Sequence, residues 1–126
     1  MNLSEFHAQF ANTALYYFLL ISLWGYWRFF RKQGLDASYW GAVVIAEVLL
    51  LIQSGIGTYL WIIGLRPARG MHVLYGIVSL TALPAVYIYT KGRSERADML
   101  MYSTTALITV GLLLRAIFTA QVALGG

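Results

Sequence analysis

Residues 39–63 read YWGAVVIAEVLLLIQSGIGTYLWII, a run of 25 residues with one charged side chain, Glu47. A helix that crosses a bilayer needs roughly 20 mainly apolar residues, because the hydrocarbon core is about 30 Å thick. This run is long and apolar enough, so its composition predicts a membrane-spanning helix. The rest of the chain can be judged by the same standard.

Three further windows are long and apolar enough to span a bilayer: residues 8–30, 71–89 and 99–124. The whole chain of 126 residues is 60% hydrophobic and 11% charged, and this charged share is about half that of an ordinary soluble domain. We therefore expect residues 1–126 to form a single transmembrane domain. The first window does not have the flanks of a signal peptide, because Glu5 precedes it and a basic cluster follows it.

The connections between the four windows are short: WRFFRKQGLDAS (27–38), GLRPARG (64–70) and TKGRSERAD (90–98). Short connections make successive helices antiparallel neighbours. The predicted fold is therefore an all-α integral membrane protein, an up-down four-helix transmembrane bundle. Helix-start signals stand at Asp36 or Ser38, at Pro67 and at Ser94.

Basic residues are distributed unevenly over these connections. The first and third hold Arg28, Arg31, Lys32, Lys91, Arg93 and Arg96, and the second holds Arg66 and Arg69. Because Lys and Arg are enriched on the cytoplasmic side, this distribution predicts both termini on the outer, non-cytoplasmic side of a multi-pass protein. We expect it in a bacterial cytoplasmic membrane. Interfacial aromatic residues are expected at the cytoplasmic side (Trp24, Tyr26, Trp27, Tyr39, Trp40, Tyr87, Tyr89) and at the outer side (Tyr59, Trp61).

The composition also excludes several kinds of site. The chain has no cysteine, so disulfides, thiolate metal sites, iron–sulfur clusters and thiol nucleophiles are excluded. Histidine is then the strongest remaining ligand for a soft metal. The net charge of +4 lies in loops between predicted spans, and membrane topology explains it better than nucleic-acid binding does.

The chain has two histidines, His7 and His72, and each lies near the start of a predicted helix. The first and third helices run in the same direction, so both histidines are expected at similar depth on the outer side. Ala11 and Gly76 follow them by four residues, which places a small residue on the same helical face one turn deeper. The pattern indicates a metal held between two histidines, with room for a flat macrocycle. The alternative is a pair of interfacial, hydrogen-bonding histidines.

Three arginines are expected near the same level. Arg115 lies about 19 residues beyond Arg96, or roughly 28 Å along a helix axis, which brings it to the depth of the histidines. Together with Arg66 and Arg69 it could pair with the two propionates of a heme. Arg115 could instead extend to the outer surface. Phe10, Tyr75 and Trp61 are candidates to pack on the macrocycle or to serve as ordinary core residues.

The second window contains two further polar residues, Glu47 and Gln53. An interhelical hydrogen bond is the favoured interpretation of Gln53. For Glu47, neutral packing against Ser or Thr, a proton path and a quinone contact remain open. Four glycines, Gly55, Gly57, Gly76 and Gly111, are interpreted as positions of close helix packing.

Three segments carry a resemblance to a known family: EFHAQFANTAL (5–15), LIQSGIGTYL (51–60) and RPARGMHVLYGIVSLTALP (66–84). Together they resemble one four-helix half of a heme A synthase. In that family two such halves are fused, and each contributes a histidine pair from its first and third helices, one half holding heme b and the other heme O. The resemblance implies that His7 and His72 are axial ligands of one heme iron.

This sequence departs from the family pattern in three ways. The family has a glutamate one turn before a histidine, whereas here Glu5 precedes His7 by two residues and Ser4 precedes it by three. The external cysteine pair of many members is absent, and one half is present, so heme A synthesis would require a homodimer. In architecture the chain also resembles four-helix membrane cytochromes of the cytochrome b561 kind.

The predicted function is a membrane-embedded b-type cytochrome that binds one heme b per chain for one-electron transfer. Two histidines fill both axial positions of an iron, which favours electron transfer over heme-modifying oxidoreductase chemistry. A quinol or another membrane redox protein is the expected partner besides the lipid bilayer. The alternatives are a half-sized heme A synthase-like dimer and a cofactor-free accessory subunit of a respiratory or photosynthetic complex.

Overall fold

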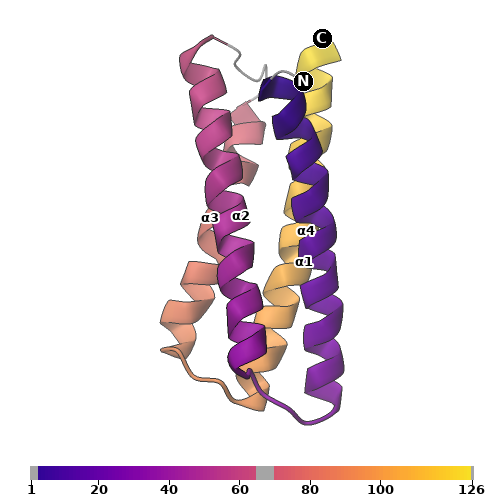
Figure 1. The fold of residues 1–126 in the computed structure, drawn as a ribbon, viewed down its shortest axis with the longest axis vertical. Coiled ribbons are helices and arrows are strands. Elements are labelled where there is room, and N and C mark those ends of the chain that lie inside the picture. Colours follow the sequence, from indigo (N-terminus) through magenta and orange to yellow (C-terminus); the bar gives the residue numbers. More distant parts are fainter. Residues whose placement is uncertain (1–2, 65–69, 126) are drawn as a thin grey trace.

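A computed structural model of the chain describes the backbone of residues 3–64 and 70–125, and these residues form four helices. The helices are α1 (Leu3–Phe30), α2 (Ala37–Ile62), α3 (Gly70–Thr90) and α4 (Arg96–Gly125). They alternate in direction, so the start of α1, the end of α2, the start of α3 and the end of α4 share one end of the bundle (Figure 1). The predicted all-helical, up-down bundle is confirmed for the described residues.

Three of the helices are long and apolar enough to cross a membrane, as expected of a membrane protein: residues 37–62, 72–90 and 96–118. Among the described residues α1 does not join this set, although with 28 residues it is longer than α2. Its first half carries Gln9, Asn12 and Thr13 on exposed positions, which lowers its apolar content. The fourth span, predicted for residues 8–30, therefore stays a prediction.

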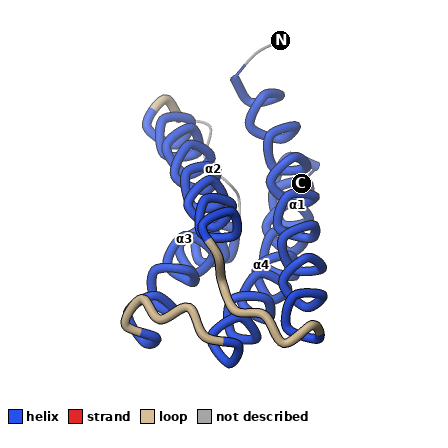
Figure 2. The backbone as a smooth tube through the Cα atoms, turned by 60° about the horizontal axis from the view of Figure 1, so that its bottom comes forward, coloured by secondary structure: helices blue, strands red, loops and turns tan. Residues whose placement is uncertain are grey.

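The helices surround the core in the order α1, α2, α3, α4. Helix α1 packs most extensively against α4 and also against α2, and α3 packs against α4 and, over a smaller area, α2. The tube view shows α1 beside α4, with α2 and α3 on the other side (Figure 2). Helices α1 and α3 are therefore diagonal partners, and only long side chains can bridge them.

Carboxylate side chains accept hydrogen bonds from backbone N–H groups at the starts of α2 and α4. Asp36 caps α2, because its side chain accepts a hydrogen bond from the Tyr39 backbone N–H (2.9 Å), as predicted. At the start of α4 the side chain of Asp98 accepts one from the backbone N–H of Glu95 (3.0 Å). The prediction of Ser94 as the cap was wrong by one residue: its hydroxyl accepts a hydrogen bond from the Trp40 indole (2.7 Å) instead. Pro67 lies outside the described residues.

Most of the buried residues lie between the middle of the bundle and the two loops at residues 31–36 and 91–95. Helices α1 and α4 approach each other closely at Gly25, where an added Cβ would clash with Ser103 Oγ and would lie 2.6 Å from the Tyr39 hydroxyl. Tyr39 is fully buried and donates a hydrogen bond to the Ile21 carbonyl (2.8 Å). Tyr39 lies in the first turn of α2 and points into the bundle, where the absence of a side chain at residue 25 leaves room for its hydroxyl; its place at a membrane interface stays a prediction.

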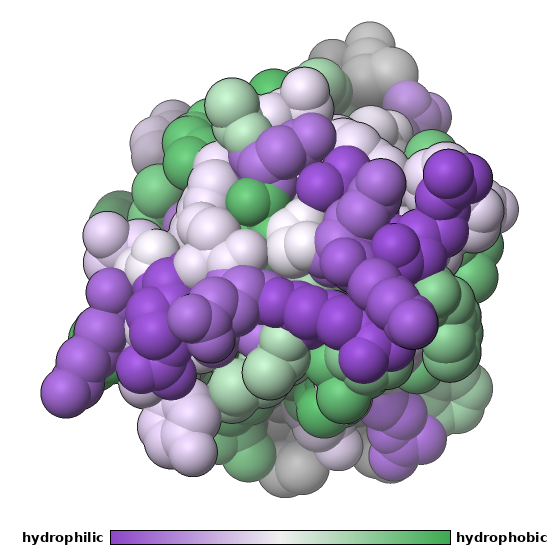
Figure 3. Space-filling view, turned by 90° about the horizontal axis from the view of Figure 1, so that it is seen from below, coloured by the Kyte–Doolittle hydropathy of each residue, from purple (hydrophilic) through white to green (hydrophobic). Residues whose placement is uncertain are grey.

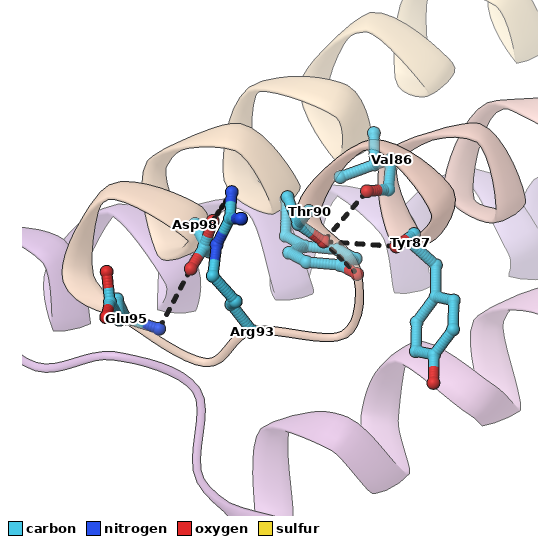
Figure 4. Close-up of polar contacts among 7 residues, drawn as sticks. Val86, Tyr87, Thr90, Arg93, Glu95 and Asp98 are labelled. Atoms are coloured by element: carbon cyan, nitrogen blue, oxygen red, sulfur yellow. Dashed lines mark hydrogen bonds and ion pairs between the residues drawn. The ribbon is translucent and has the colours of Figure 1, made fainter.

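The two described loops, residues 31–36 and 91–95, lie at the same end of the bundle and are joined by hydrogen bonds. We call this end of the bundle the loop end. The Leu35 backbone N–H donates to the Ser94 carbonyl (3.0 Å), and the Arg96 guanidinium donates to the Phe29 carbonyl (2.9 Å). Seen from below, hydrophilic residues run across this end (Figure 3). Figure 4 shows buried Asp98 between the Arg93 guanidinium (3.7 Å) and the Glu95 backbone. The polar groups here satisfy one another.

Candidate cofactor site

The structure brings the two histidines together at the opposite end of the bundle; we call this the histidine end. The rings of His7, on α1, and His72, on α3, have centroids 6.4 Å apart and planes at 75°. Both side chains are partly buried. The predicted common depth is therefore confirmed, and the pair spans the diagonal between two helices that do not pack on each other.

This separation can be compared with that of two imidazoles bound on opposite sides of one metal ion. A metal–imidazole bond of about 2 Å, plus about 1 Å from the ring nitrogen to the ring centre, puts the two centroids roughly 6 Å apart. The observed 6.4 Å agrees with this value. The angle between the ring planes imposes no further condition, since each imidazole can rotate about its own metal–nitrogen bond.

The environment of His72 selects the nitrogen that can bind a metal. Its Nδ1 lies 2.8 Å from the backbone carbonyl oxygen of Ala116 on α4. A carbonyl oxygen only accepts hydrogen bonds, so Nδ1 is the protonated nitrogen and, in the neutral ring, Nε2 carries the lone pair. Histidine ligands of metals are usually oriented in this way by a carbonyl or carboxylate behind them.

His7 is held from α2 by two residues one helical turn apart. The Gln53 side-chain amide donates a hydrogen bond to the His7 backbone carbonyl (2.8 Å), which confirms the predicted interhelical role of Gln53. Gly57 faces the imidazole: an added Cβ there would lie 3.2 Å from Cε1 and 3.6 Å from Nε2. The ring therefore rests against bare helix backbone. Nδ1 of His7 and Oε1 of Gln53 are both buried without a hydrogen-bond partner.

Of the four glycines interpreted as close-packing positions, Gly57 is the one that meets a described neighbour. An added Cβ at Gly55, Gly76 or Gly111 would meet nothing within 4 Å among the described residues, so the interpretation was wrong for these three. Gly55 and Gly111 lie on exposed helix faces, and Gly76 is half-buried. Ala11 is half-buried as well.

The arginines predicted to pair with propionates are placed only in part. Arg115 lies one residue before Ala116, the partner of His72, so its predicted depth is confirmed. Its side chain is exposed, and the guanidinium lies 5.9 Å from the ring centroid of Phe118 on the same helix. Arg66 and Arg69 lie outside the described residues.

The other residues singled out in the sequence are less closely tied to the histidines. Phe10 is half-buried and stacks on Phe6 with ring centroids 5.7 Å apart, Tyr75 is half-buried, and Trp61 is 41% exposed. Glu47 lies in the middle of α2 and has one carboxyl oxygen, Oε2, buried without a hydrogen-bond partner. Residues 3–64 and 70–125 contain no cluster of three or more His, Cys, Asp or Glu side chains that could hold a metal ion.

Sequence reasoning missed two members of this site. The Ala116 carbonyl is a backbone group, and no residue type signals it. Gly57 could have been found, because it follows Gln53 by four residues and therefore shares its helix face.

Comparisons with known proteins add no relative. No model of a known protein family matches the chain, and neither a curated protein nor a solved structure was found to be similar to it. The resemblance to heme A synthases and to four-helix cytochromes therefore stays a prediction from the sequence motifs.

Proposed function

We propose that this protein is a membrane-embedded b-type cytochrome, which binds one heme between His7 and His72 and transfers single electrons. The observation that carries the proposal is the histidine pair itself: the chain's two histidines, from diagonal helices, with ring centroids 6.4 Å apart. Imidazoles at this separation match the spacing required on either side of one iron.

A heme suits this pair better than a bare metal ion does. Metal ions in proteins usually take four or more ligands, and two histidines supply two. A porphyrin supplies four nitrogens of its own, so His7 and His72 would be enough to hold its iron. A heme held by both histidines would supply one-electron chemistry. Ala116 and Gln53 would hold the two ligands from behind, and Ala11 and Gly76 would leave space beside the ring.

The orientation in the membrane follows from the basic residues. We assign the loop end, with six Lys and Arg residues, to the cytoplasm of a bacterium, and the histidine end to the outer side of the cytoplasmic membrane. The heme would then exchange electrons near the outer face, with a quinol or another membrane redox protein as partner. Arg66, Arg69 and Arg115 are the candidates to pair with its propionates.

Visible spectra of the detergent-purified protein, oxidised and reduced, followed by a pyridine hemochrome assay, test the proposal. We expect a low-spin b-type spectrum with about one heme per chain. His7→Ala and His72→Ala should each abolish it, whereas the matched controls Thr13→Ala on α1 and Thr81→Ala on α3, both at exposed positions, should keep it.

Other outcomes point to the alternative functions. Heme O or heme A in the assay would favour the half-sized heme A synthase-like dimer. A protein that stays colourless after hemin is supplied would contradict the proposal and favour the cofactor-free accessory subunit. Full heme retention in both histidine variants would overturn the ligand assignment.

A further inference from the structure

Gln53 is anchored by one end of its amide. Its Nε2 donates to the His7 backbone carbonyl at 2.8 Å, and because a carbonyl oxygen only accepts, the amide nitrogen must be the end that faces it. The other end, Oε1, is then an acceptor. It is buried and has no hydrogen-bond partner.

The imidazole of His7 also lacks a hydrogen-bond partner at one of its nitrogens. Its Nδ1 is buried without a partner as well. The two residues are neighbours, since the Gln53 amide already donates to the His7 backbone carbonyl. An unpaired buried acceptor beside an unpaired ring nitrogen is satisfied at once if Nδ1 carries the hydrogen and donates it to Oε1.

The imidazole of His7 meets no side chain at residue 57. Its Cε1 edge faces Gly57, where an added Cβ would approach to 3.2 Å. Gly57 lies one helical turn from Gln53 on the same face of α2, so the two residues flank the imidazole. Because residue 57 has no side chain, no Cβ stands on this side of the imidazole to oppose a rotation that brings Nδ1 to the amide oxygen.

We infer that Gln53 is the positioning residue for His7: its Oε1 accepts the Nδ1 hydrogen and thereby leaves the Nε2 lone pair to bind the heme iron. The binding of heme iron by Nε2 rests on the proposed function, whereas the hydrogen bond between Gln53 and His7 does not. It makes the two ligands equivalent in tautomer, because the Ala116 carbonyl fixes His72 in the same way. They differ in kind, since a side chain behind His7 can be substituted and a backbone carbonyl cannot.

The hydrogen bond can be tested without heme. In protein labelled with ¹⁵N-histidine the chain gives two imidazoles, and His72 serves as the internal reference. We expect both rings of the heme-free wild type in the Nδ1–H tautomer. Gln53→Met, which keeps the side-chain length and removes the acceptor, should shift His7 toward the Nε2–H tautomer and leave His72 unchanged. A wild-type His7 in the Nε2–H form, or a His7 that does not respond to Gln53→Met, would overturn the inference.

The second measurement separates orientation of the imidazole from simple anchoring of the backbone. After titration with hemin, Gln53→Met should bind about 10- to 100-fold more weakly, the usual effect of losing a group behind a metal ligand. Gln53→Glu keeps an acceptor oxygen and loses the amide donor. It should bind less than about tenfold more weakly and lower the midpoint potential, because a stronger acceptor makes the imidazole a better donor to iron.

A control variant and two contrary results separate a failure of the inference from a failure of the proposed function. Thr58→Ala, at an exposed position of α2, should match the wild type in affinity and potential. If Gln53→Glu loses as much affinity as Gln53→Met and leaves the potential unchanged, Gln53 only anchors the backbone and the inference fails. If the tautomers respond as expected but the wild type binds no hemin, the proposed function fails and the hydrogen bond stands.

Discussion

The two ends of the bundle differ in how their polar groups are satisfied. At the loop end Asp36, Asp98 and Ser94 each have hydrogen-bond partners, and the loops are joined through backbone groups. Toward the histidine end, buried polar atoms of His7 and Gln53 lack partners. Buried polar atoms without partners are rare, because each costs about 1–3 kcal/mol. The described polar groups of the loop end thus find partners within the protein, whereas two buried polar atoms near the histidine end do not.

The largest effect is expected from filling the close approach at Gly25. In Gly25→Ala the added methyl group would clash with Ser103 and approach the Tyr39 hydroxyl to 2.6 Å, so one helix must move. We expect a loss of about 2–3 kcal/mol in unfolding free energy, since overpacking outweighs the better helix propensity of alanine. Unfolding in mixed micelles measures it. Gly41→Ala, with nothing within 4 Å, is the control and should not be destabilised.

The next largest effect is expected at the histidine end, where a substitution should weaken heme binding without destabilising the fold. In Gly57→Ala the methyl group meets His7 Cε1 at 3.2 Å and displaces the imidazole. We expect about tenfold weaker hemin binding, equal to about 1.4 kcal/mol, without loss of unfolding free energy. Gly55→Ala, two residues away and without a neighbour within 4 Å, should bind as the wild type does. Equal affinities for the two variants would show that His7 is not held against α2.

A smaller effect is expected at the cap of α2. Asp36→Ala removes the hydrogen bond to the Tyr39 backbone and an ion pair with Arg28 (3.3 Å). The cap accounts for most of the expected loss of about 1 kcal/mol. The ion pair adds little, since the Asp36 side chain is 49% exposed. Asp36→Asn keeps a capping oxygen and should retain nearly full stability; a loss as large as that of Asp36→Ala would assign the effect to the ion pair. Hemin affinity should not change in either variant.

The smallest effect is a gain. Lys32, two residues after the end of α1, has a φ of 60°, in the left-handed region, which is strained for a residue with a side chain and favours glycine. Lys32→Gly should therefore raise the unfolding free energy by about 0.5–1 kcal/mol. Lys32→Ala serves as the control, because alanine keeps the strain and removes the charge. A gain of the same size in Lys32→Ala would trace the effect to charge rather than to the backbone.

The sequence predicted the bounds of the helices well, but it predicted less well which helix faces contact one another. Each predicted span lies within an observed helix to within one residue, because long apolar windows and charged loops define them. The common depth of His7 and His72 followed from antiparallel topology alone. Helix rotation did not follow: Gly55 and Gly111 were expected at helix contacts and lie on exposed faces. In an apolar chain both faces of a helix are hydrophobic, so composition does not tell core from lipid-facing surface.

Some of the polar contacts could be predicted from the sequence and others could not. The Gln53 bond to α1 was predictable, because a buried amide must find a partner. The burial of Tyr39 was not, since it depends on the absence of a side chain at Gly25 on another helix. The Ala116 carbonyl could not have been predicted from residue types at all.

The diagonal position of the histidines has a consequence for biosynthesis. His7 lies on the first helix and His72 on the third, and the carbonyl that orients His72 belongs to α4. At a synthesis rate of about 5–20 residues per second, the 65 positions between the histidines delay the second ligand by roughly 3–13 seconds. The pair cannot form on a nascent hairpin of α1 and α2. If the site holds a heme as proposed, loading it would require that all four helices have been synthesised and have packed together.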